Sequence, residues 1–297
     1  MNKIIQFTCL ALCLLIFARG SLSAAEPHPD PPPQTSDSQY TITVIPFYSP
    51  EKIWTLYTPF IDFLKHSTGK PWTLKLFSSH KALIDGLCNG QVTLALLGPV
   101  PLGRVMEQCN AEPVLVALSK NDTPFYRSII VTTDPSITSL SELKGKKLGF
   151  FKGSTAAHIM PRTILRQAGL DKNSFVPVFF EGQDHIVNAL LTRQVTAAGL
   201  KETLFAKFKD DNFRALHTSG QLPNFTFAAS PVAKPEIKTL FVDTLLQLAP
   251  NSNESDRQQM ITWDDEIKYG FTPPTEPFLN SVKDLLGLTN VIMREDR

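Results

Sequence analysis

Short apolar segments alternate with amphipathic segments along most of this chain. Apolar runs of about four to eight residues, some continuous and some alternating with polar residues, are typical of strands. These strands are expected at 40–45, 72–77, 92–97, 113–118, 125–131, 147–151, 175–180, 196–200, 213–217 and 223–230. Apolar residues spaced three and four positions apart predict helices at 50–68, 80–88, 104–108, 156–168, 184–191, 202–208, 234–248 and 275–286, with a capped helical turn at 139–145.

The order of these elements predicts an α/β fold with mostly parallel sheets in two lobes. Roughly 270 residues remain if the N-terminal signal peptide described below is removed, and this is more than one hydrophobic core usually holds. We expect one lobe to comprise residues 40–125 and 226–297, and the other residues 126–225. The chain would cross between the lobes as extended strands near Tyr126 and near Phe227, leaving a ligand cleft between the lobes.

The N-terminus has the pattern of a secretory signal peptide. Lys3 precedes an apolar run at 4–17, and Ser23-Ala24-Ala25 offers small residues for cleavage. The run is too short to span a membrane, so we expect a signal peptide at 1–25 that is cleaved after Ala25. Residues 26–39 are rich in Pro, Asp and Ser and predict a disordered leader. The mature chain is therefore expected in the periplasm.

Charge and cysteine content narrow the function further. Loss of Lys3 and Arg19 with the signal peptide leaves 27 basic against 28 acidic residues, a net charge near −1. Nucleic-acid binding would need a basic field, so this class is not expected. Cys88 and Cys109 remain after cleavage, and in an oxidising compartment a disulfide between them is expected, with two separately buried thiols as the alternative.

A strand, a tight turn and a helix start meet at residues 147–158. Gly153 suits the turn, and Ser154 or Thr155 is suited to cap the helix. The first N–H groups of a helix have no partner within it, and the helix dipole is positive there, so this end favours an anion. The alternative is an ordinary capped helix, and the rest of the chain has to decide between the two.

Several short motifs, taken in order, resemble those of a known family. They are Pro46 and Tyr48; Leu97-Gly98-Pro99; Tyr126-Arg127-Ser128; Ser139-Leu140-Ser141-Glu142-Leu143-Lys144-Gly145-Lys146; Gly153-Ser154-Thr155-Ala156 with Pro161; Gly182-Gln183-Asp184-His185; and Ala197-Ala198-Gly199. Together they resemble the phosphate, phosphite and phosphonate group of ABC-transporter substrate-binding proteins, which have the type II periplasmic-binding-protein fold. The resemblance covers essentially the whole mature chain.

The resemblance implies a phosphorus oxyanion held between two lobes at the Ser154-Thr155 helix start. Members of the family complete the pocket with an aromatic residue, a tyrosine and a histidine, which correspond here to Tyr48, Tyr126 and His185. Two departures bear on the ligand. Ala156-Ala157 replaces the usual second Ser-Gly, and Thr196 replaces an aspartate suited to an aminoalkyl group. The resemblance therefore favours phosphate, phosphite or a related phosphonate over aminoethylphosphonate.

Other residues are candidates from their positions. Gly98 and Pro99 end a buried strand, at the sheet edge where ligands sit in open α/β sheets. Asp184 and His185 begin a helix and either face the pocket or act as a cap. His158 either faces the cleft or packs within its helix. Lys201 either provides a positive charge for the anion or is a lysine exposed to solvent. Tyr48 either binds the ligand or packs between the lobes, and its place in a strand-to-helix loop favours binding. Ala156 belongs to the candidate helix start.

The sequence favours a binding protein over an enzyme. Ser154, His158, His185 and Asp184 superficially form a hydrolase set, but the Gly-x-Ser-x-Gly elbow is absent. The histidines lack the spacing of a zinc site, so we expect no metal, no cofactor and no catalytic residue. The expected partners are a small oxyanion and the membrane subunits of an ABC permease, with the protein itself a monomer. A sensor domain that presents an anion to a membrane receptor is the alternative, because the fold serves both roles.

Overall fold

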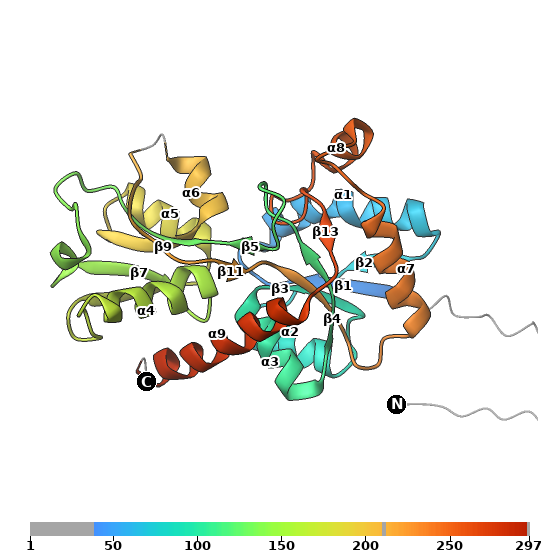
Figure 1. Ribbon diagram of the computed structural model, residues 1–297, viewed down its shortest axis with the longest axis horizontal. Helices are drawn as coiled ribbons and strands as arrows, with labels where there is room; N and C mark the ends of the chain where they lie inside the picture. Colours follow the sequence, from blue (N-terminus) through green and yellow to red (C-terminus); the bar gives the residue numbers. More distant parts are fainter. Residues whose placement is uncertain (1–38, 210–211, 296–297) are drawn as a thin grey trace, which may run out of the picture. The chain divides into compact units, whose positions relative to one another are not determined.

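The computed structural model describes residues 39–209 and 212–295. The expected signal peptide at 1–25 and the expected leader, apart from residue 39, lie outside these residues. Two separate sheets organise the described part, and a two-stranded ribbon lies between them (Figure 1). We call each sheet with the helices packed on it a lobe, the first lobe having the larger sheet.

The first lobe is built on a six-stranded sheet with the order β13-β4-β12-β3-β1-β2. β1 pairs in parallel with β2 and β3, whereas β12 lies antiparallel between β3 and β4. Its strands are β1 (Tyr40–Val44), β2 (Trp72–Leu74), β3 (Leu94–Leu97), β4 (Glu112–Ala117), β12 (Thr226–Ala229) and β13 (Phe271–Thr272). Its helices are α1 (Pro50–Thr68), α2 (His80–Cys88), α3 (Pro99–Cys109), α7 (Pro235–Leu246) and α8 (Glu254–Met260). α1 contacts α7, and α2 contacts α3 (Figure 1).

The second lobe is built on a five-stranded sheet with the order β10-β6-β9-β7-β8. β7 pairs in parallel with β8 and β9, and β6 pairs antiparallel with β9 and β10. Its strands are β6 (Ser128–Thr132), β7 (Lys147–Phe151), β8 (Val176–Phe180), β9 (Ala197–Lys201) and β10 (Arg214–Thr218). Its helical elements are a 3₁₀ turn (Leu140–Leu143), a π-helical turn (Thr155–Ile159), α4 (Met160–Gln167), α5 (Gln183–Leu191) and α6 (Glu202–Phe208).

Two extended crossings join the lobes and pair with each other. β5 (Phe125–Tyr126) and β11 (Leu222–Pro223) form an antiparallel ribbon, with Tyr126 opposite Leu222. Each of the single strands expected at 125–131 and 223–230 is therefore divided in two, because the chain must turn from the ribbon into a lobe sheet. The α/β class and the two-lobed architecture expected from the sequence are confirmed. The expectation of mostly parallel sheets is wrong, because both sheets are mixed: the strands that return through the crossings, β12 and β6, pair antiparallel with their neighbours.

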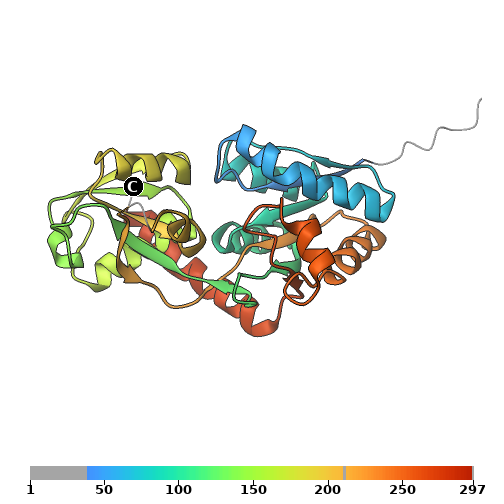
Figure 2. The ribbon, with the colours of Figure 1, turned by 90° about the horizontal axis from the view of Figure 1, so that it is seen from above.

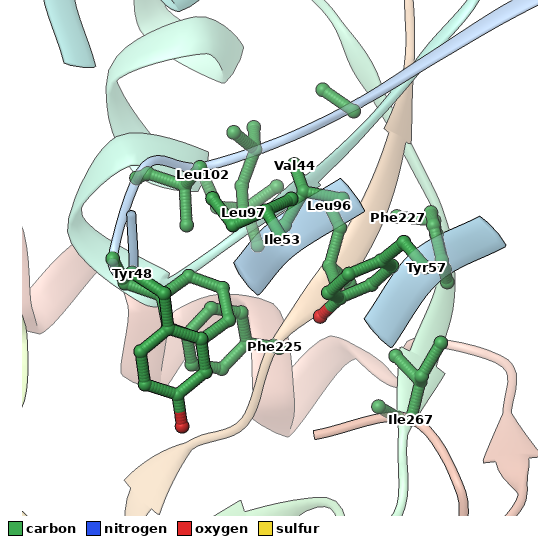
Figure 3. Packing of buried hydrophobic residues seen from close by; sticks show 14 of the residues in the cluster. Val44, Tyr48, Ile53, Tyr57, Leu96, Leu97, Leu102, Phe225, Phe227 and Ile267 are labelled. Atoms are coloured by element: carbon green, nitrogen blue, oxygen red, sulfur yellow. The ribbon is translucent and has the colours of Figure 1, made fainter. Parts of the chain in front are cut away.

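The core of the first lobe follows the apolar pattern of the sequence. α1 begins at Pro50 with Ser49 as its cap, and it buries Ile53, Tyr57 and Phe60. The Phe60 ring stacks on Phe227 of β12 with ring centroids 5.6 Å apart. Figure 3 shows Ile53 of α1 close to Leu96 of β3, and Tyr57 of α1 close to Phe227. α1 thus packs against the centre of the sheet and fixes the loop that precedes it.

The last helix is longer than the sequence pattern suggested. α9 runs from Glu276 to Glu295, whereas we expected a helix that ends at residue 286, before Gly287. The continuation is stabilised by packing, because Ile292 is buried with Val100 of α3 and Ile159 of the second lobe. Glu295 also pairs with Arg162 and Arg166. α9 contacts both lobes and therefore links them, as the two crossings also do (Figure 2).

Cys88 and Cys109 form a disulfide in the structure, with their Cα atoms 5.5 Å apart. The bond joins the last residue of α2 to the last residue of α3. Within residues 39–209 and 212–295, none of the helices has the length and apolar character needed to cross a bilayer.

Candidate functional site

The turn before the π-helical segment has the geometry that its sequence suggested. Gly153 has a φ of +82°, a left-handed conformation that glycine adopts without strain. Ser154 is the cap, since its side-chain Oγ accepts a hydrogen bond from the N–H of Ala157 at 3.2 Å. The N–H groups of Thr155 and Ala156 precede the first intrahelical hydrogen bond, so they remain available to an external acceptor.

A small cavity lies in front of this helix start. Its volume is about 30 Å³, enough for about two water molecules. Residues from both lobes and from the crossings line it: Ile45, Phe47, His80, Gly98, Pro99, Pro101, Tyr126, Phe151, Ser154, Thr155, Ala156, Gln183, Lys201 and Phe225. Of the residues proposed from sequence, the cavity brings together Gly98, Pro99, Tyr126, Ser154, Thr155, Ala156 and Lys201.

The first lobe contributes a second helix start to the cavity. Gly98 caps α3, and Pro99 occupies its first position. The helix expected at 104–108 therefore begins five residues earlier, at Pro99. Proline fits the first turn of a helix because the N–H groups there have no intrahelical acceptor. The N–H of Val100 instead donates to Oγ1 of Thr155 in the second lobe at 3.3 Å.

Lys201 is the charged residue of the cavity wall. Its side chain is almost fully buried (1% exposed), which rules out the solvated lysine considered from sequence. Nζ donates to a carboxylate oxygen of Glu266 and, at 2.7 Å, to Oδ1 of Asn224. It also lies 4.3 Å from the ring centroids of both Tyr126 and Phe225. Burial lowers the pKa of Lys201, and the Glu266 carboxylate opposes this shift.

Two carboxylates lie behind this lysine. Glu266 also accepts a hydrogen bond from Oγ1 of Thr203 at 3.2 Å. Asp264 accepts from the Tyr57 hydroxyl at 3.3 Å and from the N–H of Glu266 at 3.0 Å. Burial, together with the nearby Glu266 charge, raises the pKa of Asp264 to about 6. The positive charge of Lys201 is thus compensated by a carboxylate that does not line the cavity.

The helix start that contains Asp184 and His185 has a different environment. α5 begins at Gln183 with Gly182 as its cap, so Asp184 lies in the first turn rather than at the cap as expected. The N–H of Gln183 donates to the carbonyl oxygen of Phe47 at 3.2 Å, and Lys52 pairs with Asp184 at 2.9 Å. His185 is exposed, and neither Asp184 nor His185 lines the cavity.

Tyr48 and His158 also lie outside the cavity wall. Tyr48 is buried beside Phe47, with ring centroids 4.4 Å apart, and Nζ of Lys52 lies 3.7 Å from its ring centroid. Figure 3 shows its hydroxyl directed away from the labelled core residues. Burial raises the pKa of this phenol well above its usual value. His158 is fully buried, and its Nδ1 accepts a hydrogen bond from the N–H of Gly153 at 3.1 Å.

Several cavity residues were missed from the sequence. Gln183 stands within the Gly182-Gln183-Asp184-His185 motif, one or two positions from the residues chosen there. Phe47 immediately precedes Tyr48, which was chosen from the sequence. His80 is the first residue of a helix that follows a strand, as Ser154 and Asp184 also lie near helix starts that follow strands. The residues described in the structure contain no group of three or more His, Cys, Asp or Glu side chains that could hold a metal ion.

Comparison with known proteins gives a consistent family assignment. A family model for the periplasmic substrate-binding protein of phosphonate ABC transporters matches residues 42–276. The phosphate-import protein PhnD of Mycolicibacterium smegmatis is 23% identical over 280 residues, covering 84% of this chain and 85% of that protein.

Solved structures show the same fold at low sequence identity. PhnD1 of Prochlorococcus marinus, in complex with methylphosphonate, superimposes with a TM-score of 0.74 at 15% identity, covering 86% of this chain and 99% of that one. A binding protein component of an ABC phosphonate transporter from Pseudomonas aeruginosa gives a TM-score of 0.73 at 16% identity, covering 87% of each chain. The fold is the two-lobed type II periplasmic-binding-protein fold.

Proposed function

The chain belongs to the family of periplasmic substrate-binding proteins of phosphonate ABC transporters, and we propose that it captures a small phosphorus oxyanion in the Ser154 cavity and delivers it to an ABC permease. The family is one of transport binding proteins rather than enzymes. The proposed ligands are phosphate, phosphite and small phosphonates. We further propose that the signal peptide is cleaved near Ala25 and that the mature protein acts as a monomer.

The Ser154 helix start is the observation that carries the proposal. It leaves the N–H groups of Thr155 and Ala156 without an intrahelical acceptor, and both residues line a cavity to which both lobes contribute. Backbone N–H groups and the positive end of the helix dipole together bind an anion without a basic side chain at the contact point. Thr155 adds a hydroxyl that already joins the two lobes through Val100.

The size of the cavity and its polar groups favour a small ligand. The cavity is small, about 30 Å³, and this argues against a ligand with a long substituent. An aminoalkyl substituent would need a carboxylate with a free oxygen. Glu266, the nearest acidic side chain to Lys201, already has one oxygen paired with Lys201 and the other bonded to Thr203. Thr196 stands where the family commonly has an aspartate, as the sequence indicated.

Titration calorimetry of the mature chain, residues 26–297, tests the proposal. Methylphosphonate, phosphite or phosphate should bind saturably, whereas aminoethylphosphonate should bind at least about tenfold more weakly, about 1.4 kcal/mol. Bound ligand at about 100 times its Kd should also raise the free energy of unfolding by about 2.7 kcal/mol. A chain that binds none of the three phosphorus oxyanions would exclude the proposed function.

Delivery to a permease needs a separate measurement. The ligand-loaded protein should stimulate ATP hydrolysis by the cognate permease reconstituted in vesicles, and the Ala156→Asp variant should not. Equal stimulation by the protein with and without ligand would argue against delivery and would leave the binding result intact.

A further inference from the structure

His80 is a polar residue of the cavity wall to which the proposed function assigns no role. It is the first residue of α2 in the first lobe, and Ser79 caps that helix by accepting a hydrogen bond from the N–H of Ala82 at 3.2 Å. Its ring lines the same cavity as Ser154 and Thr155. His80 is therefore placed by a rigid, capped helix rather than by a loose loop.

The imidazole ring reaches across to the turn that leads into Ser154. It lies edge-on to the ring of Phe151, with centroids 5.2 Å apart. A Cβ atom placed on Gly153 would be 3.4 Å from Nδ1 of His80. The ring is thus held against the second lobe at the place where the oxyanion is proposed to bind.

One nitrogen of this ring has no partner. Nε2 is buried, and it makes no hydrogen bond with any of the residues that the structure describes. A buried polar atom without a partner is unfavourable, and nearly all such atoms in folded proteins find one. A ligand in the cavity that His80 lines is a partner in the right place.

The charges around the cavity indicate which protonation state of the ligand binds beside this nitrogen. Burial, together with the Arg104 guanidinium, lowers the pKa of His80 to about 4, so the ring is neutral at neutral pH and keeps a lone pair on one nitrogen. Lys201 is the only charged side chain in the described cavity wall, and Glu266 compensates it. A doubly charged ligand would find no net positive charge there.

We propose that His80 binds the ligand by accepting a hydrogen bond from its hydroxyl group, so that the site takes the oxyanion in its singly charged, protonated form. The inference rests on the proposed function and adds to it a residue and a protonation state. The helix start at Ser154 donates to the unprotonated oxygens, and His80 accepts from the protonated one.

Methylphosphonate and methanesulfonate form the test pair. At mildly acidic pH both are singly charged and have nearly the same shape, but only methylphosphonate carries a hydroxyl. The parent protein should bind methylphosphonate more tightly. The His80→Phe variant keeps a ring against Phe151 and should bind methylphosphonate about tenfold to a hundredfold more weakly, as for loss of one hydrogen bond to a charged ligand. Its affinity for methanesulfonate should change by less than about threefold, so the ratio of the two affinities should fall.

Two further variants make the result specific. His80→Gln retains a carbonyl acceptor and should recover much of the preference for methylphosphonate. His185→Phe, which changes the exposed histidine at the start of α5, should leave both affinities unchanged. Thermal unfolding of all three variants checks that each is folded before its affinities are compared.

The inference fails if the His80→Phe variant binds methylphosphonate as tightly as the parent. It also fails if that variant loses both ligands equally, because the ring would then act by packing or by donating a hydrogen bond, which both ligands accept. A parent protein that binds no phosphorus oxyanion would overturn the proposed function, and this inference with it, so the two failures are distinguishable.

Discussion

Two helix starts of the second lobe, at Ser154 and at Gly182, lie beside the first lobe. They differ in whether their free N–H groups and positive dipole end already have partners within the protein. At Ser154 the N–H groups of Thr155 and Ala156 have no acceptor within the helix, and both residues line a cavity. The first turn has no acidic residue. At Gly182 the N–H of Gln183 donates to Phe47, and Asp184 with its partner Lys52 occupies the first turn.

The difference shows that a helix start is a binding site only when the protein leaves it unsatisfied. Both starts follow a strand, and both have a favourable dipole. At the Gly182 start, however, the first lobe supplies the acceptor and Asp184 supplies the negative charge. The Gly182 start therefore holds the lobes together, whereas the Ser154 start is the one available to an anion.

The largest expected effect concerns Lys201, which belongs to the second lobe, lines the cavity with Ser154 and pairs with Glu266 of the first lobe. Lys201→Met should lower the free energy of unfolding by about 3–5 kcal/mol, because it leaves Glu266 buried without its partner. Lys207→Met is a matched control, since the Lys207 side chain of the Lys207–Asp265 pair is 44% exposed, and it should cost less than about 1 kcal/mol. Urea unfolding of both variants gives the comparison. Equal losses would mean that burial of the pair has no energetic consequence.

A negative charge placed at the Ser154 start should abolish its difference from the Gly182 start. Ala156→Asp should weaken binding of the best phosphorus oxyanion by about 3 kcal/mol, as two unit charges about 5 Å apart repel at an effective dielectric constant near 20. Ala156 is buried, so Ala156→Asn serves as the control of similar shape that introduces no charge. Calorimetry on the pair isolates the charge. If the aspartate variant binds as well as the asparagine variant, the anion does not bind at this helix start.

Removal of one donor from the Ser154 start should have a smaller effect. Thr155→Ala should weaken binding by about 2 kcal/mol, since a charged acceptor loses one hydrogen bond while the backbone donors remain. Thr155→Ser keeps the hydroxyl and should bind within about threefold of the parent. Affinities measured by calorimetry test both. An alanine variant that binds like the serine variant would show that the hydroxyl serves only contacts within the protein, those with Val100 and Tyr126.

The Gly182 start should tolerate loss of its ion pair. Lys52→Met removes the partner of Asp184, and both side chains of the pair are more than a third exposed. We expect less than about 1 kcal/mol in the free energy of unfolding and less than about threefold in affinity. Lys65→Met, which breaks a pair within α1 itself, is the control. A tenfold loss of affinity for the Lys52 variant alone would indicate that lobe closure depends on this pair.

The sequence predicted the elements and the Ser154 start because both depend on local signals. Strand and helix periodicity, the Ser49 cap and the Gly153 turn are encoded within a few residues of where they act. The cavity wall depends on which residues meet across the lobes. Gln183 and Phe47 were missed although their neighbours Asp184 and Tyr48 were named, because one position along a helix or loop changes the direction of a side chain.

The extent of α9 and the role of Lys201 could not be predicted for the same reason. Gly287 suggested a helix end, but contacts of Ile292 with Val100 and Ile159 stabilise the helix beyond it. The sequence left Lys201 as either a counter-charge or a solvated residue, and its partner Glu266 lies 65 residues away in the chain. Long-range pairing of this kind leaves no periodic signal.

The smallest expected effect separates the two helix starts most directly. His185 was proposed from the family resemblance as a ligand donor, but its side chain is exposed on α5 and does not line the cavity. His185→Ala should therefore change affinity for methylphosphonate by less than about twofold, well under the cost of one lost hydrogen bond to a charged ligand. His80→Ala, measured beside it, should give a loss of about tenfold or more. If His185→Ala gives the larger loss, the Gly182 start contributes to the site in solution, and the contrast between the two helix starts does not hold.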